Sequence, residues 1–132
     1  MKLKTSDLTG LALDWAVAQS LPGVSVALDG GVLREMGVDG EPIFNPSGHW
    51  QQGGALIESE NINLVRRTHA GTSESHHEVL RLLGWIAYKT PKAYWMTPVT
   101  HTAENPLKAA MRCLVQHTLG DTVEVPDALV NL

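Results

Sequence analysis

The chain has a single cysteine, Cys113, among its 132 residues, so an intrachain disulfide is impossible. Low cysteine usage is typical of proteins in reducing compartments. Charged residues are also few, at 18%, and the 14 acidic residues outnumber the 10 basic ones to give a formal charge of −4. The longest basic run is Arg66-Arg67. Because binding to phosphate backbones needs clustered positive charge, this balance argues against nucleic acid as a partner.

Long hydrophobic runs are absent as well. No stretch of the sequence approaches the roughly 18 apolar residues that a membrane-spanning helix needs. The first ten residues, MKLKTSDLTG, also lack the apolar segment of a secretory signal. We therefore expect an intracellular protein that is soluble and has no membrane partner.

Several catalytic and metal-binding motifs are missing. His77-Glu78 begins like the zinc motif HExxH, but Arg81 stands where the second histidine belongs. No G-x-S-x-G nucleophile elbow occurs. Cys113 lies between apolar residues of a predicted helix, where a buried, inert thiol is the ordinary case. We expect no catalytic residue, no bound metal and no cofactor.

Hydrophobic periodicity predicts a helix at each end of the chain. The first spans residues 8–21, behind a capping segment at 5–7, and is stopped by Pro22-Gly23. The second is better marked, with Asn105 as N-cap, Pro106 at the first helical position and Gly120 at the C-terminus. Between and after the helices, short apolar runs indicate strands at 24–28, 62–65, 85–88, 93–96 and 123–125, with a tight turn at 29–31 and a short helical segment at 78–83. This pattern predicts an α+β fold, a single domain over residues 1–132 with short antiparallel strands flanked by the N-terminal and C-terminal helices.

The stretch FNPSGHWQQGGALIE, residues 44–58, is the strongest candidate for a binding site. Its indole offers a flat face for a base or sugar, and its amide, hydroxyl and imidazole groups can form hydrogen bonds. Its two adjacent glycines would let backbone N–H groups approach a phosphate or carboxylate. A nucleotide-type site needs such groups. The residues that carry them are Asn45, Ser47, His49, Trp50, Gln51, Gly53 and Gly54.

A structural interpretation of the same stretch also stays open. In it, residues 45–54 form a polar connection, Trp50 belongs to the core, and the glycines only permit a turn into a strand at Ala55. The sequence contains no complete phosphate-loop pattern that would decide between the two.

Two charged residues on the predicted helices complete the candidate ligand-binding set. At helical spacing Asp14 points partly away from the apolar stripe, so we expect it to be exposed or at the rim, where it could accept a hydrogen bond from a loop or a ligand. Arg112 carries the forked donor suited to phosphate or carboxylate. For each, a solvated surface position is the alternative.

Three blocks of the sequence, in this order, carry a shared pattern at Leu13-Asp14-Trp15, Pro46-Ser47, Trp50, Gly53-Gly54, Ile57, Ala109-Ala110-Met111-Arg112, Val115, Gly120-Asp121, Val123, Val125 and Pro126. Together these blocks resemble the NinX-like phage proteins. The resemblance implies a small accessory protein of a phage or prophage that acts in the bacterial cytoplasm, and it implies no reaction. The region between residues 66 and 105 departs from the family pattern, so nothing is carried over to His76, His77, Tyr94 or Trp95.

Three functions remain as hypotheses. The first is a non-enzymatic protein that binds a small nucleotide-like molecule at the central stretch and sequesters it, as a phage protein could do with a host defence signal. The second is an adaptor that modulates a host or phage enzyme through the aromatic residues of 85–96. The third is a small nucleotide hydrolase with His49 as general base. The same aromatic residues lead us to expect a homo-oligomer.

Overall fold

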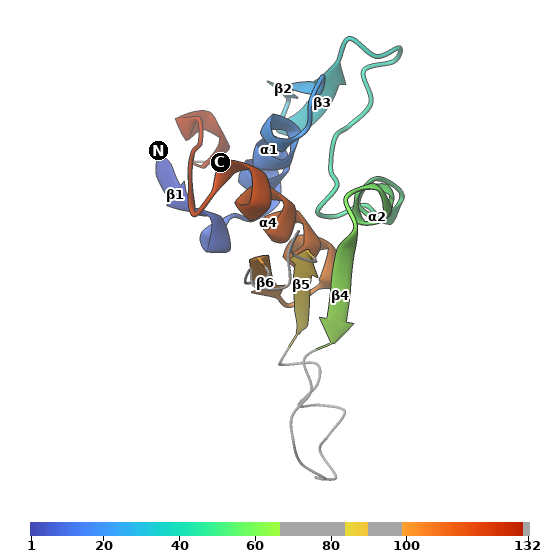
Figure 1. Cartoon of the computed structure of the whole chain (residues 1–132). Helices are drawn as coiled ribbons and strands as arrows, with labels where there is room; N and C mark the ends of the chain where they lie inside the picture. Colours follow the sequence, from blue (N-terminus) through green and yellow to red (C-terminus); the bar gives the residue numbers. More distant parts are fainter. Residues whose placement is uncertain (67–83, 90–98, 131–132) are drawn as a thin grey trace, which may run out of the picture.

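The computed structural model describes residues 1–66, 84–89 and 99–130. The predicted helical segment at 78–83 and the predicted strand at 93–96 lie outside these residues. Among the described residues, the structure confirms an α+β fold with short antiparallel strands (Figure 1). The elements are β1 (Lys2–Lys4), η1 (Thr5–Asp7), α1 (Gly10–Ser20), β2 (Ser25–Asp29), β3 (Val32–Met36), α2 (Trp50–Ser59), β4 (Ile62–Arg66), β5 (Trp85–Lys89), β6 (Val99–Ala103), α4 (Pro106–Leu119), β7 (Thr122–Glu124) and η2 (Asp127–Leu129).

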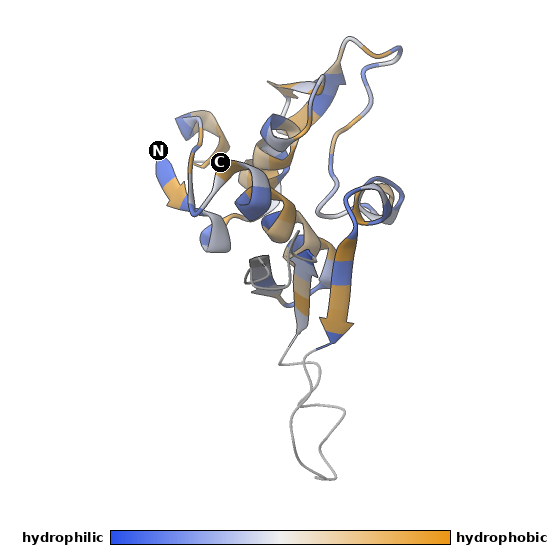
Figure 2. Cartoon of the chain, in the orientation of Figure 1, coloured by the Kyte–Doolittle hydropathy of each residue, from blue (hydrophilic) through white to orange (hydrophobic). Residues whose placement is uncertain are grey.

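Helix α4 lies at the centre of the fold, in contact with α1 on one side and with strands β5 and β6 on the other (Figure 1). Local chemistry sets both of its ends, as predicted. The side-chain oxygen of Asn105 accepts a hydrogen bond of 2.8 Å from the N–H of Lys108, and Pro106 occupies the first turn, where no intrahelical N–H is required. Gly120, with φ of 92°, ends the helix in a conformation that glycine adopts readily. Hydrophobic residues run along α1 and α4 where the two helices meet (Figure 2).

Helix α1 is enclosed on more than one side. It packs against α4, and it also contacts both strands of the β2–β3 hairpin. Its buried residues therefore span most of its circumference instead of forming one stripe; they are Ala12, Leu13, Asp14, Ala16, Val17 and Ala18. The prediction that Asp14 is exposed or at the rim is wrong, because the hairpin covers the face that a simple amphipathic helix would leave in water.

The β2–β3 hairpin confirms the turn predicted at residues 29–31. Asp29 pairs with Val32, so Gly30 and Gly31 form a two-residue loop. Their φ angles of 59° and 87° are both positive, as the tight turns that match strand twist require. The hairpin is tied to the following segment, since the N–H of Phe44 donates to the carbonyl of Leu33 at 2.8 Å.

The central stretch differs most from its prediction. A helix, α2, begins at Trp50 and runs through Gly53 and Gly54 to Ser59. The predicted loop through residue 54 and the strand at Ala55 are therefore wrong. Two glycines inside a helix cost about 1 kcal/mol each relative to alanine, which is why local propensity opposed a helix here. The tertiary contact that requires one of these glycines is described below.

Strands β4, β5 and β6 form an antiparallel sheet in that order, and they confirm the strands predicted at 62–65 and 85–88. A separate pair joins β1 to β7, with Leu3 opposite Val123. This pair places two segments from opposite ends of the sequence side by side (Figure 1). No helix in the described part of the chain is long and apolar enough to cross a membrane.

Candidate functional site

The segment that leads into α2 packs against the core through two of its apolar residues. Phe44 and Pro46 are buried, while Asn45 and Gly48 between and after them are exposed. A turn closes here, because the N–H of Gly48 donates to the carbonyl of Asn45 at 3.2 Å. Every second residue of 44–46 thus faces the core, and the polar groups between them face outward.

Asp14, on α1, forms a hydrogen bond with this segment. Its Oδ1 accepts a hydrogen bond of 2.9 Å from the backbone N–H of Ser47, and the Asp14 residue is only 2% exposed. Burial raises the pKa of Asp14 to about 6, and the hydrogen bonds from Ser47 offset part of this effect. Since a buried carboxylate that is held by a backbone donor positions that donor, Asp14 fixes where the 44–48 turn sits on α1.

Gln52 holds the same segment from the other side, and sequence reasoning did not single it out. Its side-chain Nε2 donates to the carbonyl of Ile43 at 2.7 Å, and its Oε1 accepts from the N–H of Asn45 at 2.6 Å. A glutamine three residues after the N-cap is a known signal for a side chain that reaches back to the preceding backbone. Gln52 reaches back in the same way, but its two partners, Ile43 and Asn45, lie further upstream than the N-cap residue.

Gly53 is required by close packing. A Cβ built on it would lie 2.3 Å from the carbonyl oxygen of Pro46 and 2.6 Å from Cδ2 of Leu107, so α2 could not approach the turn and α4 as it does. Its N–H donates to the carbonyl of His49 at 2.9 Å. Gly54 has only ordinary space around it, with Trp50 as nearest neighbour at 3.8 Å. Both glycines lie inside the helix, so they are not the open backbone donors that the sequence indicated.

The outward face of this region carries the remaining predicted residues. Trp50 is 58% exposed, which contradicts the alternative that it is a core residue. His49 and Gln51 beside it are exposed as well, and so is Asn45. His49 is the N-cap of α2 and makes no side-chain capping hydrogen bond. The first N–H groups of a helix have no intrahelical acceptor, and together they carry a partial positive charge.

A cavity lies beneath this face, between α1, β3 and residues 43–45, with Asp14 in its wall. Its volume is about 190 Å³, below the roughly 300–1,000 Å³ of ordinary small-molecule pockets. The space beside Asp14 is therefore too small for a ligand of nucleotide size. The predicted set divides into an outer group (Asn45, His49, Trp50, Gln51) and supporting residues beneath it (Asp14, Ser47, Gly53).

Arg112 is used elsewhere in the fold. Its Nε donates to the carbonyl of Leu8 at 2.8 Å, and its NH1 donates to the carbonyl of Thr102 at 3.0 Å. These bonds join η1 and β6 to α4 instead of reaching the central segment. The neighbouring Cys113 is buried, as predicted, and burial raises the pKa of its thiol to about 11. No cluster of three or more histidine, cysteine, aspartate or glutamate side chains that could hold a metal ion occurs within the described residues.

A family model described as bacteriophage P22 NinX matches residues 4–118. The chain belongs to this family. The match spans α1, the central segment with α2, and nearly all of α4, so the whole candidate site falls within it. Membership in the NinX family identifies the chain as a phage accessory protein and confirms the resemblance found in the sequence. No curated protein matches the chain.

Proposed function

We propose that this NinX-family protein binds a small nucleotide-like ligand on the outer face of residues 45–51 and sequesters it in the cytoplasm of the host cell. The observation that carries the proposal is the exposure of Trp50, at 58%, on a segment that is otherwise firmly held. A large aromatic side chain is costly to leave in water unless a partner covers it. Stacking of a base on an aromatic ring contributes about 1–3 kcal/mol.

The groups around Trp50 suit the anionic part of a nucleotide-like ligand. Helix α2 begins at this residue without a side-chain cap, and the N–H of Gln52 already donates to the carbonyl of His49. The N–H groups of Trp50 and Gln51 can receive a phosphate or other anion. Gln51 and Asn45 add exposed amide groups nearby. The face would thus bind a base against the indole and an anionic group at the helix N-terminus.

Rigidity of the segment supports binding with little ordering cost. Asp14 holds Ser47 from below, and Gln52 holds Ile43 and Asn45 from the side. A preorganised surface loses less conformational entropy when it binds a ligand. No hydroxyl or carboxylate of the described residues hydrogen-bonds to the ring of His49, which favours binding over hydrolysis by a histidine base.

Native mass spectrometry tests the proposal directly. The purified protein would be measured before and after incubation with lysate from cells that make nucleotide signals. We expect a mass increment in the nucleotide range that Trp50→Ala abolishes and Trp50→Phe retains in part, because phenylalanine keeps a flat ring. The same spectra report the subunit count, which tests the proposed homo-oligomer.

Two other results would reject the proposal. If no increment forms under any condition, the protein is better explained as an adaptor that binds a protein partner. If the increment forms and then shrinks to a fragment of the ligand, the protein is a hydrolase, and His49→Ala should stop the conversion.

A further inference from the structure

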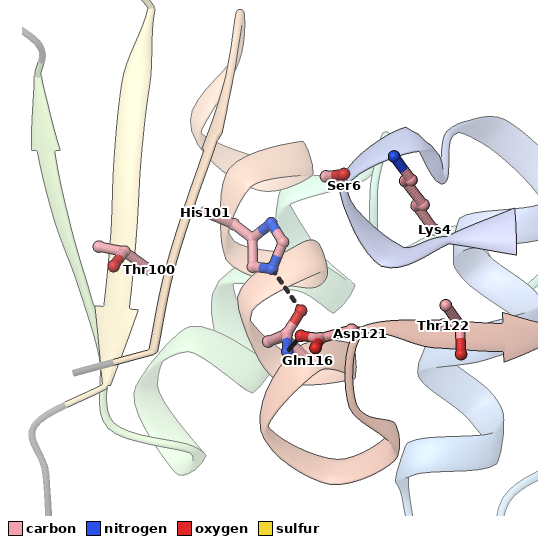
Figure 3. Close-up of a pocket in the computed structure, with 7 residues that line it drawn as sticks. All are labelled: Lys4, Ser6, Thr100, His101, Gln116, Asp121 and Thr122. Atoms are coloured by element: carbon pink, nitrogen blue, oxygen red, sulfur yellow. Dashed lines mark hydrogen bonds between the residues drawn. The ribbon is translucent and has the colours of Figure 1, made fainter. Parts of the chain in front are cut away.

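A second cavity, of about 480 Å³, opens between β6, α4 and the paired strands β1 and β7 (Figure 3). This volume lies within the roughly 300–1,000 Å³ of small-molecule sites. Its lining comes from four separate segments of the chain and shares no residue with the face around Trp50. The lining side chains are largely polar, and they include the imidazole of His101 and the ammonium of Lys4.

The side chains of Asp121, Gln116 and His101 are connected by two hydrogen bonds, and the donor of each bond can be identified. The Asp121 carboxylate can only accept, so the side chain of Gln116 directs its Nε2 donor toward it. The amide oxygen of Gln116 is thereby turned toward His101, whose Nε2 lies 2.9 Å away. Since an amide oxygen cannot donate, Nε2 of His101 must carry the proton.

The consequence concerns the other ring nitrogen. In neutral His101 a proton on Nε2 leaves Nδ1 as a bare acceptor. Nδ1 points away from Gln116, toward the side of the cavity where Ser6 and Lys4 lie (Figure 3). No residue of 1–66, 84–89 or 99–130 donates a hydrogen bond to Nδ1. The cavity therefore offers one oriented acceptor for a hydroxyl or N–H group of a ligand.

Lys4 supplies the positive charge. It lies directly opposite Thr122 in the β1–β7 pair, so both side chains emerge on the same face beside the cavity. No carboxylate among the described residues lies within ion-pair distance of Lys4. The one acidic residue in the lining, Asp121, is already engaged by Gln116.

The cavity walls are held together from behind. Arg112, one turn before Gln116 on α4, donates to the carbonyl of Leu8 at 2.8 Å and to that of Thr102 at 3.0 Å. The buried Thr5 donates its hydroxyl to the carbonyl of Gly120 at 2.6 Å. The segment around η1, strand β6 and the C-terminal end of α4 are therefore fixed relative to one another. As a result, the positions of Lys4 and His101 on opposite sides of the cavity are set before a ligand binds.

We propose that this cavity is a second binding site, for a small anion that also carries hydroxyl groups, the chemistry of a sugar phosphate. The anionic group faces Lys4, and one hydroxyl donates to Nδ1 of His101. Gln116 and Asp121 act as positioning residues that hold the imidazole in the accepting tautomer. The site is independent of the nucleotide-like ligand proposed for the Trp50 face, and either site can exist without the other.

Ribose 5-phosphate is the probe for the test, with ribose and inorganic phosphate as its two halves. Nitrogen-15 NMR of the histidine side chains of the full chain reports both tautomer and contact. We expect His101 in the Nε2–H form, and a change in its Nδ1 resonance on addition of ribose 5-phosphate that is absent for His117. Gln116→Met should mix the tautomers and weaken binding by about twofold if the two forms become equally populated.

Two lysines on the same strand give a matched control for the anionic contact. Lys4→Gln and Lys2→Gln change the charge equally, but only Lys4 lines the cavity. We expect Lys4→Gln to lower the affinity for ribose 5-phosphate to that for ribose, while Lys2→Gln changes it less than twofold. Thermal unfolding of both variants checks that the fold is kept.

Several results would overturn the proposal. Equal losses in Lys4→Gln and Lys2→Gln would show only general charge attraction. Equal affinity for inorganic phosphate and ribose 5-phosphate would remove the hydroxyl contact with His101. An Nδ1 resonance that stays constant at millimolar ribose 5-phosphate would show that the Asp121–Gln116–His101 chain only joins β6 to α4.

Discussion

The Oδ1 atom of Asp14 accepts a hydrogen bond of 2.9 Å from the backbone N–H of Ser47, which lies 33 residues later in the chain. The bond links a buried helix to the turn that presents the outer face of the candidate site. It also places an ionisable group in the interior, where water cannot stabilise its charge. The dependence of stability on pH should reveal this cost.

Asp14→Asn tests that cost. The pKa of Asp14 is raised from 3.8 to about 6 in the folded chain, so the folded state binds the proton more tightly than the unfolded state. Asp14 therefore contributes most to the free energy of unfolding below pH 4. This contribution, about 3 kcal/mol, is lost as the pH rises through about 6. Asparagine keeps an oxygen acceptor for Ser47 but cannot ionise. We expect the variant to lack this slope and to be at least as stable as the wild type at pH 7.5, as measured by urea unfolding between pH 4 and 8.

The exposed Asp29 provides the control. Asp29→Asn removes a carboxylate that pairs with Arg34 on the surface, where ion pairs contribute little. Its stability curve against pH should follow the wild type. A curve for Asp14→Asn that also follows the wild type would mean that Asp14 is not buried as described.

Gly53→Ala and Gly54→Ala should have opposite effects on stability. A methyl group at residue 53 would meet the carbonyl oxygen of Pro46 at 2.3 Å, and we expect a loss of about 1–3 kcal/mol as α2 shifts. A methyl group at residue 54 meets nothing closer than 3.8 Å, and alanine favours the helix, so we expect a gain of about 0.5–1 kcal/mol. Thermal unfolding of the two variants side by side measures the difference. Equal effects would contradict the packing of α2 on the turn.

Comparing Gln52→Ala with Gln51→Ala tests whether Gln52 supports the 43–45 backbone while its neighbour Gln51 lies only at the surface. Gln52 makes two hydrogen bonds to the 43–45 backbone, and its loss should cost about 1–3 kcal/mol and raise amide exchange at Asn45. Gln51 is exposed, and its replacement should change stability by less than about 0.5 kcal/mol. Hydrogen exchange followed by NMR gives both readouts. Protection at Asn45 that is unchanged in Gln52→Ala would argue against its role as a brace.

Arg112→Lys should destabilise the fold by about 1–3 kcal/mol, because one ammonium cannot reproduce the two directed bonds to Leu8 and Thr102. Arg34→Lys is the matched control, since Arg34 also makes two directed bonds, to Asp29 and to the carbonyl of Glu41, but both are exposed to water and should contribute little. Urea unfolding at neutral pH compares the two. A loss in Arg34→Lys as large as that in Arg112→Lys would count against the proposed bridge.

The parts of the fold that the sequence predicted well are those set by local chemistry. Asn105, Pro106 and Gly120 mark the ends of α4 through their own backbone preferences, and Gly30-Gly31 determines the hairpin turn in the same way. Strand β7 was predicted at 123–125, within one residue of its observed bounds. Strand β1 and its pairing with β7 have no local signal, because β1 is three residues long and its partner is at the other end of the chain.

Within the candidate site, prediction failed where tertiary contacts override local rules. Gly53 favours a loop by propensity, yet it is the residue that lets α2 approach Pro46 and Leu107. Asp14 was placed at the surface because a helix with one apolar stripe was assumed, whereas the hairpin covers its other face. The exposure of Trp50 depends on where α2 begins, and that start was not recognised from the sequence.

The pairing of α1 with α4 has a consequence for synthesis on the ribosome. Helix α1 is apolar on nearly all sides, and the helix that covers it begins only at Pro106. At about 5–20 residues per second, α1 waits on the order of ten seconds for its partner. During that time its apolar surface is available to chaperones or to other nascent chains. The core of this phage protein therefore closes late in translation, and a chain truncated before α4 should be recognised as unfolded by host proteases.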